Sequence, residues 1–247
     1  MSTLLITLLL AINPVHAAKG KKKDKPHQLD SAELPGSAHT MKKGEGHVNA
    51  IGYSAYGLAP KTEVGTTLRA LRWGPNVGLE QQLMGGGGTA LSLGVGASST
   101  WQFNSQTLSA GLLYTKGAPK ENRYNLGAGV GLTTTDPGSN LDRVNAVGTN
   151  LHGGYDLVLK PKRTLQLTLD VDPLNSVRAE AFVGNAAVAY NHGFKTVRVR
   201  AGLRVGDGIA SGTVNSSLLV TEGIIDPLDV NRWTPMPFVD VWGHFGG

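Results

Sequence analysis

The sequence predicts an all-β fold, an antiparallel up-and-down transmembrane β-barrel of about twelve strands, in a range of about ten to twelve. Three observations predict this class. Segments that alternate apolar and polar positions follow one another from Gly46 onward, separated by turn-forming clusters. Charged residues keep to one face of these segments. The chain has 34 glycines, many of them on the polar face, and no run of 18 apolar residues that would predict a membrane-spanning helix.

The segment from Lys195 to Val205, KTVRVRAGLRV, shows the alternation most clearly. Successive side chains of an extended strand point to opposite faces. One face of this strand therefore carries only valine, alanine and leucine, and the other carries Arg198, Arg200 and Arg204. The apolar face requires a non-polar medium, which is either the core of a soluble sheet or the lipid around a barrel.

The same alternation divides the rest of the chain into elements. Turn chemistry separates them at proline-containing clusters such as Lys160-Pro161-Lys162 and Asp172-Pro173-Leu174. Between such clusters we expect strands at residues 47–57, 62–73, 76–84, 88–97, 107–116, 123–133, 145–159, 163–171, 177–190, 195–205, 213–221 and 237–245.

The nature of the polar face favours a barrel over a sandwich. A soluble sandwich exposes its outer face to bulk water, whereas this polar face is rich in glycine with isolated charges of both signs, as suits a crowded interior. The segments also have the length that a tilted strand needs to cross a bilayer, and closure removes long edges. The alternative is a secreted soluble β-sandwich that acts as a binding or adhesion module.

The amino-terminal region predicts export. Residues 3–12 are apolar and are followed by small residues around Ala17, so we expect a signal peptide over 1–17, a flexible basic segment over 18–45 and the barrel over 46–247. Leaving out the seven lysines of the basic segment changes the formal net charge from +5 to −2. The lysine run could attract lipid phosphates, nucleic acid or anionic polymers by charge, or form a solvated tail. No aromatic residue lies among the lysines, so we expect no nucleic-acid partner.

The signal segment, the repeated alternating strands and the final strand PFVDVWGHF together resemble bacterial outer-membrane β-barrel proteins. In that class the last strand ends in an aromatic residue with apolar residues at every second position before it, a spacing that Val239, Val241 and Phe245 follow. The resemblance implies that these three residues form the sorting signal read by the barrel-assembly machinery. It also implies a location in the outer membrane of a Gram-negative bacterium, in contact with its lipid. Gly246 and Gly247 extend beyond the aromatic residue.

This fold suits three roles, which are a passive pore, a substrate-binding channel and a structural barrel. Charged residues on the inward face would pair across the lumen or set its selectivity, and the arginines could take a small anionic solute. The candidate lumen-lining residues are Arg69, Glu80, His152, Asp156, Asp170, Arg178, Glu180, Arg198, Arg200, Arg204 and Asp240.

Enzymatic chemistry finds little support in the sequence. An outer-membrane lipid hydrolase, the second alternative, would need a serine near His152, but Ser92, Ser109 and Ser217 have no recognisable motif around them. We assign no catalytic residue. The histidines show no metal-ligand spacing, so we expect neither a metal nor a cofactor.

Overall fold

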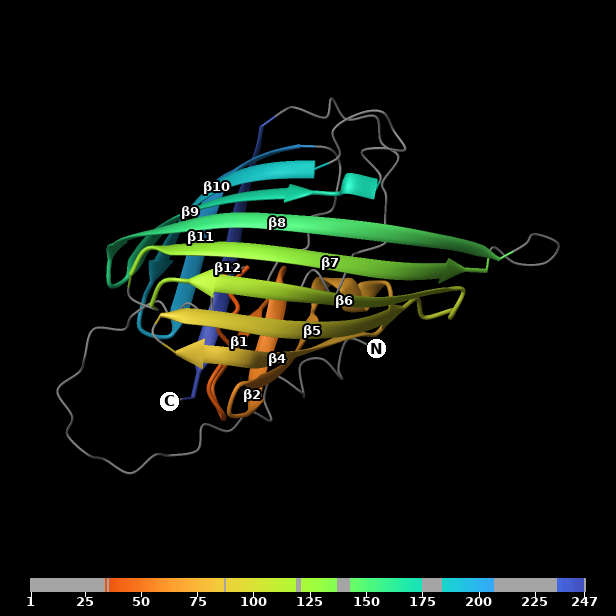
Figure 1. Cartoon of the computed structure of the whole chain (residues 1–247), viewed down its shortest axis with the longest axis horizontal. Coiled ribbons are helices and arrows are strands. Elements are labelled where there is room, and N and C mark those ends of the chain that lie inside the picture. Colours follow the sequence, from red (N-terminus) through yellow and green to blue (C-terminus); the bar gives the residue numbers. More distant parts are fainter. Residues whose placement is uncertain are drawn as a thin grey trace.

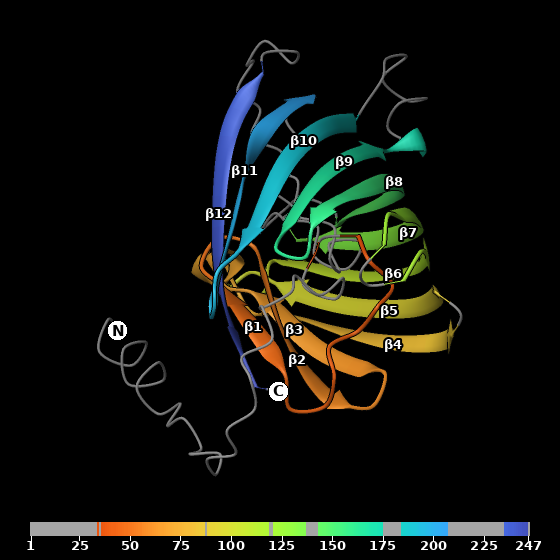
Figure 2. The ribbon, with the colours of Figure 1, turned by 90° about the vertical axis from the view of Figure 1, so that its left-hand side faces the viewer.

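The computed structural model describes residues 34, 36–86, 88–118, 121–136, 143–174, 184–206 and 235–246. They form antiparallel strands that close into one barrel (Figures 1 and 2). Each strand pairs with its sequence neighbours, and β1 pairs with β12 to complete the ring. The strands are β1 (Gly46–Asn49), β2 (Tyr53–Ala59), β3 (Thr62–Thr67), β4 (Asn76–Gly86), β5 (Thr89–Ser99), β6 (Ser105–Lys116), β7 (Arg123–Thr135), β8 (Val144–Lys160), β9 (Arg163–Val171), β10 (Gly184–Gly193), β11 (Val197–Gly206) and β12 (Met236–Phe245).

The predicted all-β barrel of twelve strands is confirmed, and the alternative sandwich is wrong because the sheet closes on itself. The set of strands differs in part. The predicted strand 47–57 is divided into β1 and β2, because Asn49 Oδ1 accepts hydrogen bonds from the backbone N–H groups of Ile51 (2.9 Å) and Gly52 (2.8 Å) and closes a turn. The predicted strand 213–221 lies outside the described residues. The other ten predictions each overlap one observed strand.

The strand predicted over 62–73 ends early. The backbone N–H of Thr67 donates to Asn76 Oδ1 at 2.7 Å, and Asn76 Nδ2 donates to the carbonyl of Thr67 at 3.2 Å, which closes the pairing of β3 with β4. Between these strands lies a short 3-10 helix, Arg69–Arg72. Arg69 is therefore exposed in a connection, which corrects the prediction that it lines the lumen from a strand.

The two faces of the barrel are inverted relative to those of a soluble protein. Within the described residues, 24 polar or charged residues are buried, whereas 33 large apolar residues are exposed. Among the largest fully buried side chains are Arg123, Arg198 and Gln166. On β11, Arg198 and Arg200 are buried and Ala201 is exposed, so the predicted facing of this strand is confirmed. No helix among the described residues is long and apolar enough to cross a membrane.

The connections at the two ends of the barrel differ in length. At the end where β1 begins and β12 finishes, which we call the terminal end, the connections are residues 60–61, 87–88, 117–122, 161–162 and 194–196. At the opposite end, the loop end, they are residues 50–52, 68–75, 100–104, 136–143, 172–183 and 207–235. The longest segments between consecutive described strands therefore join them at the loop end.

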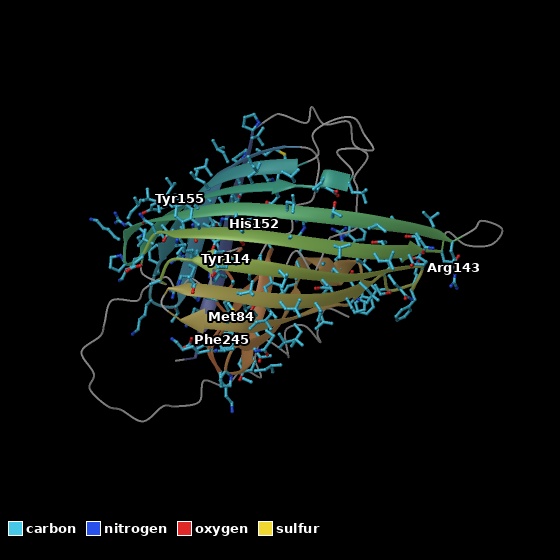
Figure 3. The ribbon with its side chains drawn as sticks, in the orientation of Figure 1. Met84, Tyr114, Arg143, His152, Tyr155 and Phe245 are labelled. Atoms are coloured by element: carbon cyan, nitrogen blue, oxygen red, sulfur yellow. The ribbon has the colours of Figure 1, made fainter. Side chains whose placement is uncertain are left out.

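Aromatic residues also gather at the two ends. Outward residues near the terminal end form what we call the tyrosine girdle, and Tyr114, Tyr155 and Phe245 of this set lie on that side, opposite Arg143, in Figure 3. The girdle consists of Tyr56, Tyr114, Tyr124, Tyr155, Tyr190, Phe194 and Phe245. At the loop end, Trp73, Trp101 and Phe103 are exposed, and Trp101 Nε1 donates to the carbonyl of Leu71 at 2.9 Å.

Candidate functional site

The interior of the barrel holds a segment of the chain itself. Residues 34 and 36–41, here called the plug, include Leu34, Ala38 and Met41, all buried. The backbone N–H of Ala38 donates to Thr115 Oγ1 on β6 at 2.7 Å, and that of Met41 donates to Glu63 Oε2 on β3 at 2.9 Å. The plug thus contacts two parts of the wall that lie three strands apart in the ring, and its course inside the ring can be followed in Figure 2.

A glycine allows the plug to approach β8 closely. Gly36 has a φ of 78°, in the left-handed region, and a Cβ at this position would collide with His152 Nε2. A residue other than glycine would therefore meet both backbone strain and a clash. His152 in turn is held by a hydrogen bond between its Nδ1 and Asp170 Oδ1 at 2.8 Å.

The plug joins β1 through a turn at the terminal end. The backbone N–H of Gly44 donates to the carbonyl of Gly57 at 2.9 Å, and Gly57 lacks a Cβ where the carbonyl of Lys42 lies. Residues 36–45 are therefore packed against the barrel, which differs from the prediction that includes them in a flexible segment over 18–45. Residues 18–33 lie outside the described residues.

Asp156 is the centre of the hydrogen-bond network beneath the plug. Arg123 Nε donates to Asp156 Oδ2 at 3.2 Å, Asn125 Nδ2 donates to the same oxygen at 3.0 Å, and Gln166 Nε2 donates to Oδ1 at 2.9 Å. Thr115 Oγ1, which accepts from the plug, donates to Asn125 Oδ1 at 2.8 Å. One chain of hydrogen bonds therefore links the plug to a buried ion pair, and such chains reinforce one another in a medium of low polarity.

A second polar group lies on β3, β4 and β5. Glu63 and Glu80 are cross-strand partners, and both are buried. Ser92 Oγ donates to Glu80 Oε1 at 2.6 Å, while Glu63 accepts from the plug. The two carboxyl groups lie side by side and accept hydrogen bonds from Ser92 Oγ and from the backbone N–H of Met41.

The arginines of β11 have individual partners. Arg198 Nη1 donates to the carbonyl of Phe194 at 2.6 Å. Arg200 lies over the ring of Phe238, 5.2 Å from its centre, and opposite Asp240 on β12. Asp240 also accepts from Asn49 Nδ2 at 2.9 Å. Arg204 is half-buried nearer the loop end.

The structure brings most of the predicted lumen residues together on the inner wall. Arg178 and Glu180 lie outside the described residues. The sequence analysis did not include Arg123 among the lumen residues. Arg123 lies two residues before the inward Asn125 on β7, so the alternation of the strand would have placed it on the same face. The sequence analysis also missed the plug, which has no periodic pattern. Glu80, His152, Asp156, Asp170, Arg198, Arg200 and Asp240 are buried in the interior.

The final strand has the predicted facing. Val239 and Val241 are exposed on the outside of β12, and Phe245 stacks on Tyr56 with ring centres 6.3 Å apart. The inward Trp242, which was not predicted as a site residue, is buried.

In the described part of the chain, His152, the base that the lipid-hydrolase alternative would need, has no hydrogen bond to a serine. His152 is hydrogen-bonded to Asp170, and its other ring nitrogen faces Gly36. Ser92 donates to Glu80 instead. A Ser–His pair requires hydrogen-bond contact between the two side chains, so this geometry gives the lipid-hydrolase alternative no support.

Comparisons of the chain with protein-family models, with curated proteins and with solved structures find no match.

Proposed function

We propose that this protein is an integral outer-membrane barrel whose lumen the plug keeps closed, and that it acts as a pore when the plug leaves. The observation that supports this proposal most strongly is that polar side chains are buried inside the barrel and large apolar side chains are exposed on its outside. Transferring a large apolar side chain out of water contributes about 1.5 to 3 kcal/mol. Exposed apolar side chains on strand after strand are therefore costly in water and favourable in lipid, and closure satisfies the backbone hydrogen bonds that lipid cannot.

Two further features support this location and give an orientation. Outer-membrane barrels have short periplasmic turns, longer outer loops and aromatic girdles at both interfaces. The terminal end has the short connections and the tyrosine girdle, so we assign it to the periplasmic side. In this proposal Val239, Val241 and Phe245 present the sorting signal to the barrel-assembly machinery from the outer face of β12.

Membrane fractionation tests the location. We expect the mature chain to remain in the membrane fraction after carbonate and urea washes and to migrate differently on a gel before and after boiling, as a barrel folded in lipid does. Recovery as a soluble species with unchanged migration would contradict the proposal.

Removal of the plug should open the lumen. We expect deletion of residues 18–41 to produce ion conductance in planar bilayers, because the plug contacts β3, β6 and β8 across the interior. The matched control is deletion of residues 18–33, which retains the plug and should stay closed like the wild type. A folded 18–41 deletion variant that conducts no ions would favour the purely structural role instead.

A single methyl group at Gly36 should weaken the plug. Gly36→Ala adds backbone strain of about 1 to 2 kcal/mol and overpacking against His152 of about 1 to 3 kcal/mol. We therefore expect more frequent channel openings. Gly44→Ala is the control, because Gly44 also has a positive φ but no atom lies within 4 Å of its added Cβ. Equal opening frequencies in the two variants would show that contact with His152 does not hold the plug.

A further inference from the structure

The terminal end of the barrel carries a ring of basic side chains outside the lumen. Six of them are exposed and the seventh, Lys162, is half-exposed. They come from the turn before β1 and from four strand connections around the ring. This group, which we call the basic rim, consists of Lys43, Lys61, Lys116, Lys160, Lys162, Arg163 and Lys195.

The charge of the basic rim is not neutralised within the described residues. None of its seven side chains forms an ion pair there with a carboxylate. Outside the lumen, the described acidic residues at this end are Glu45 and Glu121, and Glu45 pairs with Lys42 at 3.5 Å. At the loop end, by contrast, Arg143 Nε lies 3.6 Å from Asp136 Oδ2. The positive charge at the terminal end therefore faces outward without a protein counterpart among these residues.

The position of the rim relative to the tyrosine girdle indicates its partner. Lys116 follows Tyr114 by two residues on the same outward face of β6, and it is the cross-strand partner of Tyr124. Two residues of a strand tilted by about 40° extend about 5 Å along the barrel axis. The headgroup layer of a bilayer leaflet is about 5 to 8 Å thick. If the girdle lies at the edge of the hydrocarbon, Lys116 lies at the depth of the phosphates.

We infer that the basic rim binds the headgroups of anionic phospholipids in the adjacent leaflet. This rests on the proposed membrane-spanning role and adds to it a lipid class and the residues that select it. Lysine suits this task because its flexible stem carries a compact charge to a phosphate. Each basic residue near an anionic surface strengthens attraction about five-fold, and salt screens the effect.

Electron spin resonance of spin-labelled lipids tests the inference on the full-length protein in phosphatidylcholine vesicles. We expect the protein to restrict labelled phosphatidylglycerol about two- to five-fold more than labelled phosphatidylcholine, and salt to reduce this preference. The Lys116→Gln/Lys160→Gln/Arg163→Gln variant should lose most of the preference. The matched control, Arg69→Gln/Arg72→Gln/Arg143→Gln, removes the same charge from the loop end and should keep it.

The outcomes separate this inference from the proposed function. If the wild type restricted both lipids to the same extent, the inference that the rim binds anionic phospholipids would be wrong, while the membrane location would stand. The partner of the rim would then be sought among acidic proteins or polymers. Absence of any restricted lipid would overturn both the inference and the membrane location. A preference that survives in the rim variant but not in the loop-end variant would place the lipid site at the wrong end. If the triple rim variant does not fold, the single substitution Lys116→Gln, on the exposed face of β6, provides the same comparison against Arg69→Gln at the loop end.

Discussion

Replacing Asp156 with alanine is expected to destabilise the barrel by about 3 to 5 kcal/mol, because it removes the buried carboxylate that forms an ion pair with Arg123. The side chains of Arg123 and Asp156 are 1% and 0% exposed. Asn125 and Gln166 lose the same acceptor, so buried donors are left unsatisfied as well. Urea-induced unfolding of the reconstituted protein, followed by the fluorescence of its tryptophans, measures the loss.

The chain provides a matched control for this pair. Arg143 and Asp136 form the same Arg Nε to Asp Oδ2 contact at 3.6 Å, but their side chains are 74% and 49% exposed. Asp136→Ala should therefore cost less than about 1 kcal/mol. In addition, the double variant Arg123→Met/Asp156→Asn should lose less free energy of unfolding than the sum of the losses in the two single variants. Similar losses for Asp156→Ala and Asp136→Ala would contradict a dry, buried interior.

Replacing Ala201 with arginine is expected to impair assembly, because the side chain would enter lipid. Its cross-strand neighbours, Tyr190 on β10 and Val239 on β12, are exposed on the same outer face. An arginine on the lipid face costs about 2 to 4 kcal/mol at the midplane and less towards an interface. Because its partner Tyr190 belongs to the tyrosine girdle, we expect a cost at Ala201 below the midplane value. Loss of the heat-modifiable form and of protein from the membrane fraction would report the defect.

Ala201→Leu is the control, since it adds bulk without charge at the same position and should assemble normally. If Ala201→Arg also assembled normally, the outer face of β11 would lie in water. The membrane-spanning role would then lose its main support.

Much of the fold could be predicted because alternation is a local property of the strand. In β11 the pleat alone places Arg198 and Arg200 on one face and Ala201 on the other, whatever strands lie beside it. The same holds for β8, where His152 and Asp156 face inward. The sequence therefore predicts which charged residues face inward wherever the strand itself is predicted correctly. The prediction fails at Arg69, because the strand ends before this residue.

The sequence by itself determined the all-β class, the alternation of the two faces and the positions of most strands, because each depends on residues a few positions apart. Only the tertiary structure decided which inward residues meet. Arg123 reaches Asp156 and His152 reaches Asp170 through the register between strands, and β1 meets β12 across nearly the whole described chain. The position of the plug also depends on the tertiary structure. Its residues have no periodic pattern of their own, and they lie in the lumen because the wall offers Thr115 and Glu63 as acceptors for backbone N–H groups that would otherwise be buried without partners.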